Sequence, residues 1–108
     1  MGEPLKRNVG LLVEMNTVEA KSMLENELSR YRKLSYGELL SLLDKAETFE
    51  RSSPSGAVYQ IEMQIFFDDN SNRTTLRVSG EIDDGGWRAF SPLCDDFLIA
   101  PDGSFVDE

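Results

Sequence analysis

The segment AVYQIEMQIFF, residues 57–67, shows the strongest strand pattern of the chain. Polar side chains separate most of its apolar ones, so one face of an extended strand is apolar and the other is largely polar. The apolar face consists of Tyr59, Ile61, Met63, Ile65 and Phe67. Antiparallel sheets commonly bury one face and expose the other, so the alternation predicts an antiparallel sheet that is covered on one side.

Further strands are predicted on the C-terminal side of this segment. Residues 75–83 alternate in the same way, and the sequence DGG at residues 84–86 favours a hairpin turn. Residues 87–90 begin another strand, which Pro92 is expected to end or to confine to an edge, because proline donates no ladder hydrogen bond. Shorter strands are expected at residues 48–51, 97–100 and 104–106.

Two helices are predicted before the sheet. Residues 16–33 carry apolar side chains at helical spacing, after a cap at Asn16. The sequence SYGE at residues 35–38 is a capping box, which starts a second helix. Leucines dominate the positions that follow it, so this helix is expected to continue to residues 45–47.

Helices followed by a run of strands are typical of α+β proteins. We therefore expect an α+β fold with two N-terminal helices packed on one face of an antiparallel β-meander of about four to five strands. Residues 1–15 are expected to form a partly ordered N-terminal arm. Residues 16–108 are expected to form a single α+β domain, since a chain of 108 residues can bury one core.

The net charge of −9 lies almost entirely in the second half of the chain. Residues 1–56 have eight Lys or Arg against nine Asp or Glu, a balance of −1, whereas residues 57–108 have three against eleven, a balance of −8. Binding to phosphates depends on basic side chains, so neither nucleic acid nor an anionic membrane surface is an expected partner. No apolar run approaches the roughly 20 residues of a membrane span.

The residue types that are absent exclude several chemistries. The chain has no histidine, which excludes catalysis through histidine and histidine-bound metals. Its single cysteine, Cys94, stands next to two aspartates that disfavour the thiolate, so a half-buried structural thiol is expected and not a nucleophile. One cysteine cannot form an internal disulfide, which favours a reducing, cytoplasmic location. No cofactor is expected.

Carboxylates are the remaining candidates for chemistry. Glu62 and Glu81 belong to neighbouring predicted strands and could form an acid–base pair, although Glu62 opposite Arg77 would equally form a salt bridge. Residues 68–72 have the Asp and Asn spacing that opens an EF-hand loop, but later positions lack the required glycine and glutamate. No metal site is expected, and the candidate oxygen ligands for a cation are Asp68, Asn70, Asp83 and Asp84.

The leading candidate for a binding site is an aromatic and arginine cluster beside acidic pairs, residue types that are enriched at interfaces. The candidate ligand- or partner-binding residues are Trp87, Arg88, Phe90, Asp83, Asp84, Asp95 and Asp96. A core tryptophan with its neighbouring arginine paired to an aspartate would explain the same cluster without a site. Aspartates that serve turns and solubility would explain the acidic pairs.

Several segments resemble a family of small uncharacterised bacterial proteins. The resemblance runs from residue 34 to residue 106, about two-thirds of the chain, and implies no activity. Its motifs are SYGEL at 35–39, GAVYQIEMQIFFDD at 56–69, IDDGGWRAF at 82–90, DDF at 95–97 and APDGSF at 100–105. The order of elements is also similar to that of cystatin-like and nuclear-transport-factor-like folds, a likeness of fold that says little about function.

From these observations we expect a non-catalytic binding module whose partner is a protein or a small ligand. One alternative is an enzyme that uses the aspartate pairs in carboxylate or divalent-metal chemistry. The other is an acidic decoy that occupies a nucleic-acid-binding protein. A homodimer through the sheet or the helix face suits a domain of this size.

Overall fold

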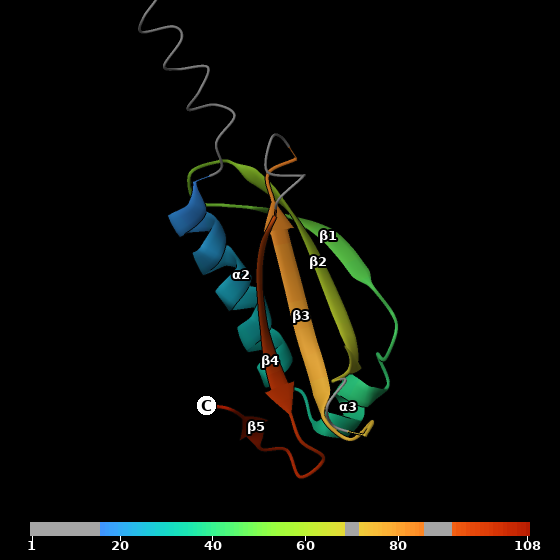
Figure 1. The fold of residues 1–108 in the computed structure, drawn as a ribbon. Coiled ribbons are helices and arrows are strands. Elements are labelled where there is room, and N and C mark those ends of the chain that lie inside the picture. The colour runs from blue at the N-terminus through green and yellow to red at the C-terminus, as the bar shows by residue number, and fades with distance from the viewer. Residues whose placement is uncertain (1–15, 69–71, 86–91) are drawn as a thin grey trace, which may run out of the picture.

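The protein is an α+β structure with one antiparallel sheet (Figure 1). The computed structural model describes residues 16–68, 72–85 and 92–108. Within them the elements are α2 (Thr17–Arg32), α3 (Tyr36–Leu40), β1 (Glu47–Ser52), β2 (Val58–Phe67), β3 (Leu76–Asp83), β4 (Leu93–Ile99) and β5 (Phe105–Val106). The sheet order is β1-β2-β3-β4-β5, so the predicted meander is confirmed. The N-terminal arm predicted at residues 1–15 lies outside the described residues.

The core lies between α2 and the face of the sheet on which this helix packs, mainly over β3 and β4 (Figure 1). Alternate strand residues point to this inner face, as the period of two in the sequence predicts. Helix residues spaced three or four apart meet them from the other side. The buried cluster comprises Ala20, Leu24, Leu28, Leu39, Tyr59, Ile61, Met63, Ile65, Leu76, Val78, Ile82, Phe97 and Ile99.

Gly80 of β3 allows α2 to approach the sheet closely. A Cβ atom at this position would lie 2.7 Å from Leu24 Cδ1 and 2.9 Å from Met63 Sδ, both of which are closer than real Cβ contacts. Leu24 and Met63 are 2% and 1% exposed, so both side chains lie inside the core. The absence of a side chain at Gly80 therefore sets the distance between the helix and the sheet.

α3 is shorter than the sequence predicts. The capping box is confirmed, because Glu38 N–H donates to Ser35 Oγ at 3.1 Å and Ser35 N–H donates to Glu38 Oε1 at 2.9 Å. After Leu40 the chain turns through hydrogen bonds that span three residues, and Asp44 then has a φ of 60°. The helix consequently ends five to seven residues before the predicted end at 45–47, and it covers only one end of the sheet (Figure 1).

β4 begins directly after Pro92, the residue at which a strand was expected to end. Residues 93–99 all pair with β3. Proline precedes the first paired residue and so removes no hydrogen bond from the ladder. Asp95 and Asp96 therefore lie inside a strand and not at a turn. The strand predicted at residues 87–90 lies outside the described residues.

The two edges of the sheet differ in length. β1 has six residues and β5 has two. Among the described residues, β1 pairs only with β2, so its other side is open (Figure 1). No helix in the described part of the chain is long and apolar enough to cross a membrane.

Candidate functional site

The acidic pairs singled out from the sequence are only partly placed by the structure. Asp83 ends β3 and pairs with Gln60, whereas Asp95 of β4 pairs with Gly80, three positions back along β3. Side chains alternate along a strand, so Asp96 points to the outer face of the sheet, which is the face turned away from α2, and Asp95 points to the inner face. The register thus separates Asp83 from Asp95 by roughly 10 Å along the strands.

The other part of that candidate site stays a prediction. Trp87, Arg88 and Phe90 lie outside the described residues, as does Asn70 of the EF-hand-like segment. Asp84 follows β3 and is half-buried.

Arg77 joins two of the aspartates on the outer face. Its Nη2 atom lies 2.8 Å from Asp68 Oδ1, and its Nη1 atom bonds Asp96 Oδ2. A carboxylate at the end of β2 is thereby tied to one in β4 through a residue of the strand between them. This pairing gives both carboxylates a structural role, since a bound arginine occupies the oxygens that a ligand would need.

Glu62 and Glu81 are directly opposite each other on the outer face. Arg77 is opposite Phe66, so the predicted pairing of Glu62 with Arg77 is wrong. Cys94 is the next residue in the same row, and it is exposed, not half-buried as expected. Desolvation first, then the charges of Glu81 and Asp96, raise the pKa of its thiol. Among the described residues no group of three or more acidic or cysteine side chains could hold a metal ion.

Replacing Glu81 by glutamine is expected to stabilise the protein. Like charges directly opposite each other in a sheet are unfavourable, so removal of one should raise the free energy of unfolding by about 0.2–1 kcal/mol. Urea unfolding at neutral pH measures the change. Addition of about 0.5 M NaCl should shrink it, because salt screens exposed charges. An equal or lower stability of E81Q at low salt would show that the two carboxylates do not repel each other.

A groove on the inner face separates α2 from the edge strand β1. We call it the α2–β1 groove, and its volume is about 380 Å³. It is lined by Glu27, Arg30, Tyr31, Leu34, Leu42, Glu47, Phe49 and Arg51. Because α2 packs mainly over β3 and β4, the inner side of β1 is left beside the helix and not beneath it.

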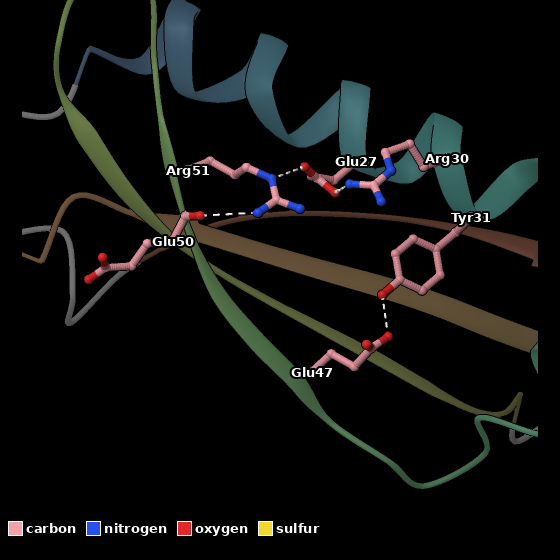
Figure 2. A network of polar contacts seen from close by, with 6 residues as sticks. All are labelled: Glu27, Arg30, Tyr31, Glu47, Glu50 and Arg51. Carbon is pink, nitrogen blue, oxygen red and sulfur yellow. Dashed lines mark hydrogen bonds and ion pairs between the residues drawn. The ribbon is translucent and has the colours of Figure 1, made fainter.

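Glu27 organises one end of this groove (Figure 2). Its side chain is only 8% exposed and accepts hydrogen bonds from Arg51 Nε at 2.9 Å and Arg30 Nη1 at 3.1 Å. A carboxylate so far removed from water is tolerated when both oxygens are paired with cations. Glu27 thereby holds two guanidinium groups, one from the helix and one from the strand, against the same carboxylate.

Tyr31 and Glu47 form the second link between the helix and β1 (Figure 2). The Tyr31 hydroxyl donates to Glu47 Oε1 at 2.5 Å. Burial first, then this hydrogen bond, raise the pKa of Tyr31 above its ordinary value, so the hydroxyl keeps its proton and remains a donor at neutral pH. The two links stand at either side of Phe49, which lies between Glu47 and Arg51 on the inner face of β1.

Each link contains an atom that could form a further hydrogen bond. Arg51 donates through Nε to Glu27 and through Nη1 to the Glu50 carbonyl at 3.2 Å, while its Nη2 makes no hydrogen bond to another described residue. Glu47 Oε2 is likewise without a partner among the described residues. The Arg51 guanidinium also lies 4.3 Å from the centre of the Phe49 ring. The groove therefore presents a cationic donor, an aromatic face and an anionic acceptor in a row.

The open edge of β1 presents backbone groups beside this row. Ser53 N–H donates to Ala57 O at 2.8 Å, which makes these two residues a hydrogen-bonded pair of the β1–β2 ladder. Such pairs recur at every second residue of an antiparallel ladder. The N–H and C=O groups that point away from β2 are therefore those of Thr48, Glu50 and Ser52.

The α2–β1 groove was not predicted from the sequence. The alternation of Glu47, Phe49 and Arg51 is visible in the sequence, and it places one anionic, one aromatic and one cationic residue on a single strand face. Their meeting with Glu27 and Tyr31 depends on the rotation of α2 about its axis, which no local pattern specifies.

Comparison with known proteins supplies no relative: no family model, curated protein or solved structure matches the chain. The resemblance to small bacterial proteins remains an expectation, and function is inferred from the site alone.

Proposed function

We propose that the protein is a non-catalytic binding module that takes up an extended segment of a protein partner along β1. The observation that supports this proposal is the open edge of β1 beside the α2–β1 groove, to which Thr48, Glu50 and Ser52 turn their backbone groups. The Glu50 carbonyl at this edge also accepts from Arg51 Nη1. In this mode of recognition a partner segment joins the sheet as a further strand. Backbone hydrogen bonds then supply affinity, and alternate side chains that enter neighbouring pockets supply specificity.

The side chains of the groove define the segment that fits. Arg51 Nη2 is an unused donor and suits a carboxylate of the incoming strand. Phe49 is two residues before Arg51 and lies on the same face of β1, because side chains alternate along a strand. It therefore suits an apolar or aromatic side chain of the incoming strand, two positions from that carboxylate. The proposed ligand is therefore an extended segment with an acidic and an aromatic residue at positions i and i+2.

A synthetic peptide tests the proposal. We expect an eight-residue peptide with Glu and Phe at positions i and i+2 to bind, and to slow amide hydrogen exchange at Thr48, Glu50 and Ser52. A peptide with Lys in place of Glu should bind at least tenfold more weakly, because it would face Arg51 with a like charge. Nuclear magnetic resonance titration gives both readouts on the full chain.

A matched pair of arginine variants locates the binding. Arg51→Gln should weaken binding of the glutamate peptide, whereas Arg77→Gln should not, because Arg77 also joins carboxylates but lies on the outer face. At a concentration where the chain is monomeric, unchanged exchange at the three β1 amides, or an equal loss with both variants, would contradict the proposal.

The two other functions considered from the sequence remain weaker proposals. The direct opposition of Glu62 and Glu81 supports carboxylate chemistry, but only as a pair. The acidic residues on the outer face support a decoy for a nucleic-acid-binding protein. The cytoplasmic location that the single cysteine favours is likewise a proposal.

A further inference from the structure

We infer that the segment taken up by β1 is β1 of a second copy of this chain. The two copies meet edge to edge about a two-fold axis through Phe49, and their five-stranded sheets continue into one another. This inference rests on the proposed function, since it identifies the partner of the same strand edge.

The pairing register follows from the geometry of β1. A two-fold axis perpendicular to the sheet places the inner faces of both copies on the same side of the joined sheet. The residue on the axis is then opposite the same residue of the other copy. The residue two positions before it is opposite the residue two positions after it in the other copy. With Phe49 on the axis, Glu47 of each copy is opposite Arg51 of the other. Thr48 is then opposite Glu50, and both have their backbone groups turned to the open edge, so these pairs form the hydrogen bonds of the new ladder. The Glu50 carbonyl already accepts from Arg51 Nη1 and uses its second lone pair for the Thr48 N–H of the other copy.

The neighbouring registers are less favourable. An axis through Glu50 would place the two Glu50 side chains directly opposite each other. An axis through Thr48 would place Lys45 opposite Arg51, which are like charges. Only the register centred on Phe49 combines two pairs of opposite charges with an aromatic pair, and aromatic cross-strand pairs are favourable.

The atoms that each chain leaves unused complement those of the other. Arg51 Nη2 and Glu47 Oε2 make no hydrogen bond to another described residue of their own chain, and the register brings one opposite the other twice. The bonds from Arg51 to Glu27 and from Tyr31 to Glu47 hold both side chains on the inner face, so little freedom is lost when the second copy arrives (Figure 2).

The other surfaces suit a second copy less well. β5 offers two residues, too short an edge for stable strand addition. The outer face carries Glu50, Glu62 and Glu81, so two such faces would bring like charges together. The edge of β1 is the surface on which charge complementarity within one sequence favours self-association.

Charge exchange tests the inference. Glu47→Arg alone places Arg opposite Arg51 at both pairs, and Arg51→Glu alone places Glu opposite Glu47. Each variant should have a dimer dissociation constant at least tenfold higher than the parent chain. An equimolar mixture of the two variants should form a heterodimer, because one chain then presents two arginines and the other two glutamates. Size-exclusion chromatography with light scattering, and native mass spectrometry of the mixture, measure both results.

Circular dichroism shows whether each variant is folded. A further variant tests the new ladder without any change of charge. Thr48→Pro removes an N–H that points away from β2, so the β1–β2 ladder is kept while the new ladder loses its donor. It should give a folded monomer. If the parent dimer is unaffected by all three substitutions, or if the mixture does not associate, the inference is wrong.

The peptide experiment separates this inference from the proposed function. The inference is overturned if the parent chain is monomeric up to about 1 mM. A dimer that escapes detection at this concentration would have a dissociation constant of about 1 mM or weaker. If that monomer still binds the glutamate peptide at β1, the proposed function stands with a different partner. If it binds no peptide, both fail.

Discussion

Replacement of Gly80 by valine is expected to lower the free energy of unfolding by about 1–3 kcal/mol, in the range typical of overpacked cores. The first added carbon alone would come within 2.7 Å of Leu24 Cδ1 and 2.9 Å of Met63 Sδ. Both side chains are almost fully buried, so relief requires Leu24 and Met63 to repack or α2 to shift away from β3. The preference of β-branched residues for strands offsets only part of this cost.

Urea unfolding followed by circular dichroism measures the effect, and Ser79→Val is the matched control. Ser79 is the preceding residue of β3, but its side chain points to the outer face, away from α2, where valine meets neither of the described helices. Gly80→Ala should fall between the parent chain and Gly80→Val. Equal stabilities of the two valine variants would contradict a close contact between α2 and β3 at this position.

Replacement of Glu27 by glutamine should give the second large loss, about 1–2 kcal/mol, less than for fully buried ion pairs because the arginines reach water. Glutamine keeps the shape of the side chain but offers one acceptor oxygen where Glu27 uses two. Arg30 and Arg51 then lose their counter-charge. Their side chains are 64% and 39% exposed, so both can turn to solvent.

The same variant should also loosen β1, since Arg51 is held to α2 through Glu27. Amide hydrogen exchange at Phe49 and Arg51, whose N–H groups face β2, should therefore accelerate more than exchange in β3. Glu25→Gln is the control, because Glu25 belongs to the same helix but is exposed, and surface changes of this kind are usually within about 0.5 kcal/mol. A similar stability for both variants would show that Glu27 contributes no more than a surface carboxylate.

The long strands and the first helix could be predicted because their patterns are local. The period of two in β2 and β3 survives in the structure since one face of each strand is buried, and Asn16 caps α2 by accepting from Glu19 N–H at 3.1 Å. The end of α3 could not be predicted in the same way. Its leucines suit a helix, but Leu42 and Leu43 pack against the core from a turn that ends at Asp44. Tertiary packing therefore overrides helix propensity in this segment.

β4 shows a different limit. Consecutive aspartates after a proline favour a turn by composition. Asp95 is accommodated in a strand because its side chain is exposed to solvent, and Asp96 because Arg77 of β3 binds it. Such compensation comes from a neighbouring strand. The same reason applies to the α2–β1 groove, whose parts are separated along the chain by about 20 residues and meet only after the register and the rotation of α2 are fixed.

The two-residue length of β5 has a consequence for concentrated solutions. A sheet with two long open edges can add copies without end, which is how fibres grow. Among the described residues this chain offers one long edge, at β1, and a short one at β5. Strand addition at β1 uses up the long edge of both copies at once, so growth closes at two, and rising concentration is expected to fill that single state without producing larger assemblies.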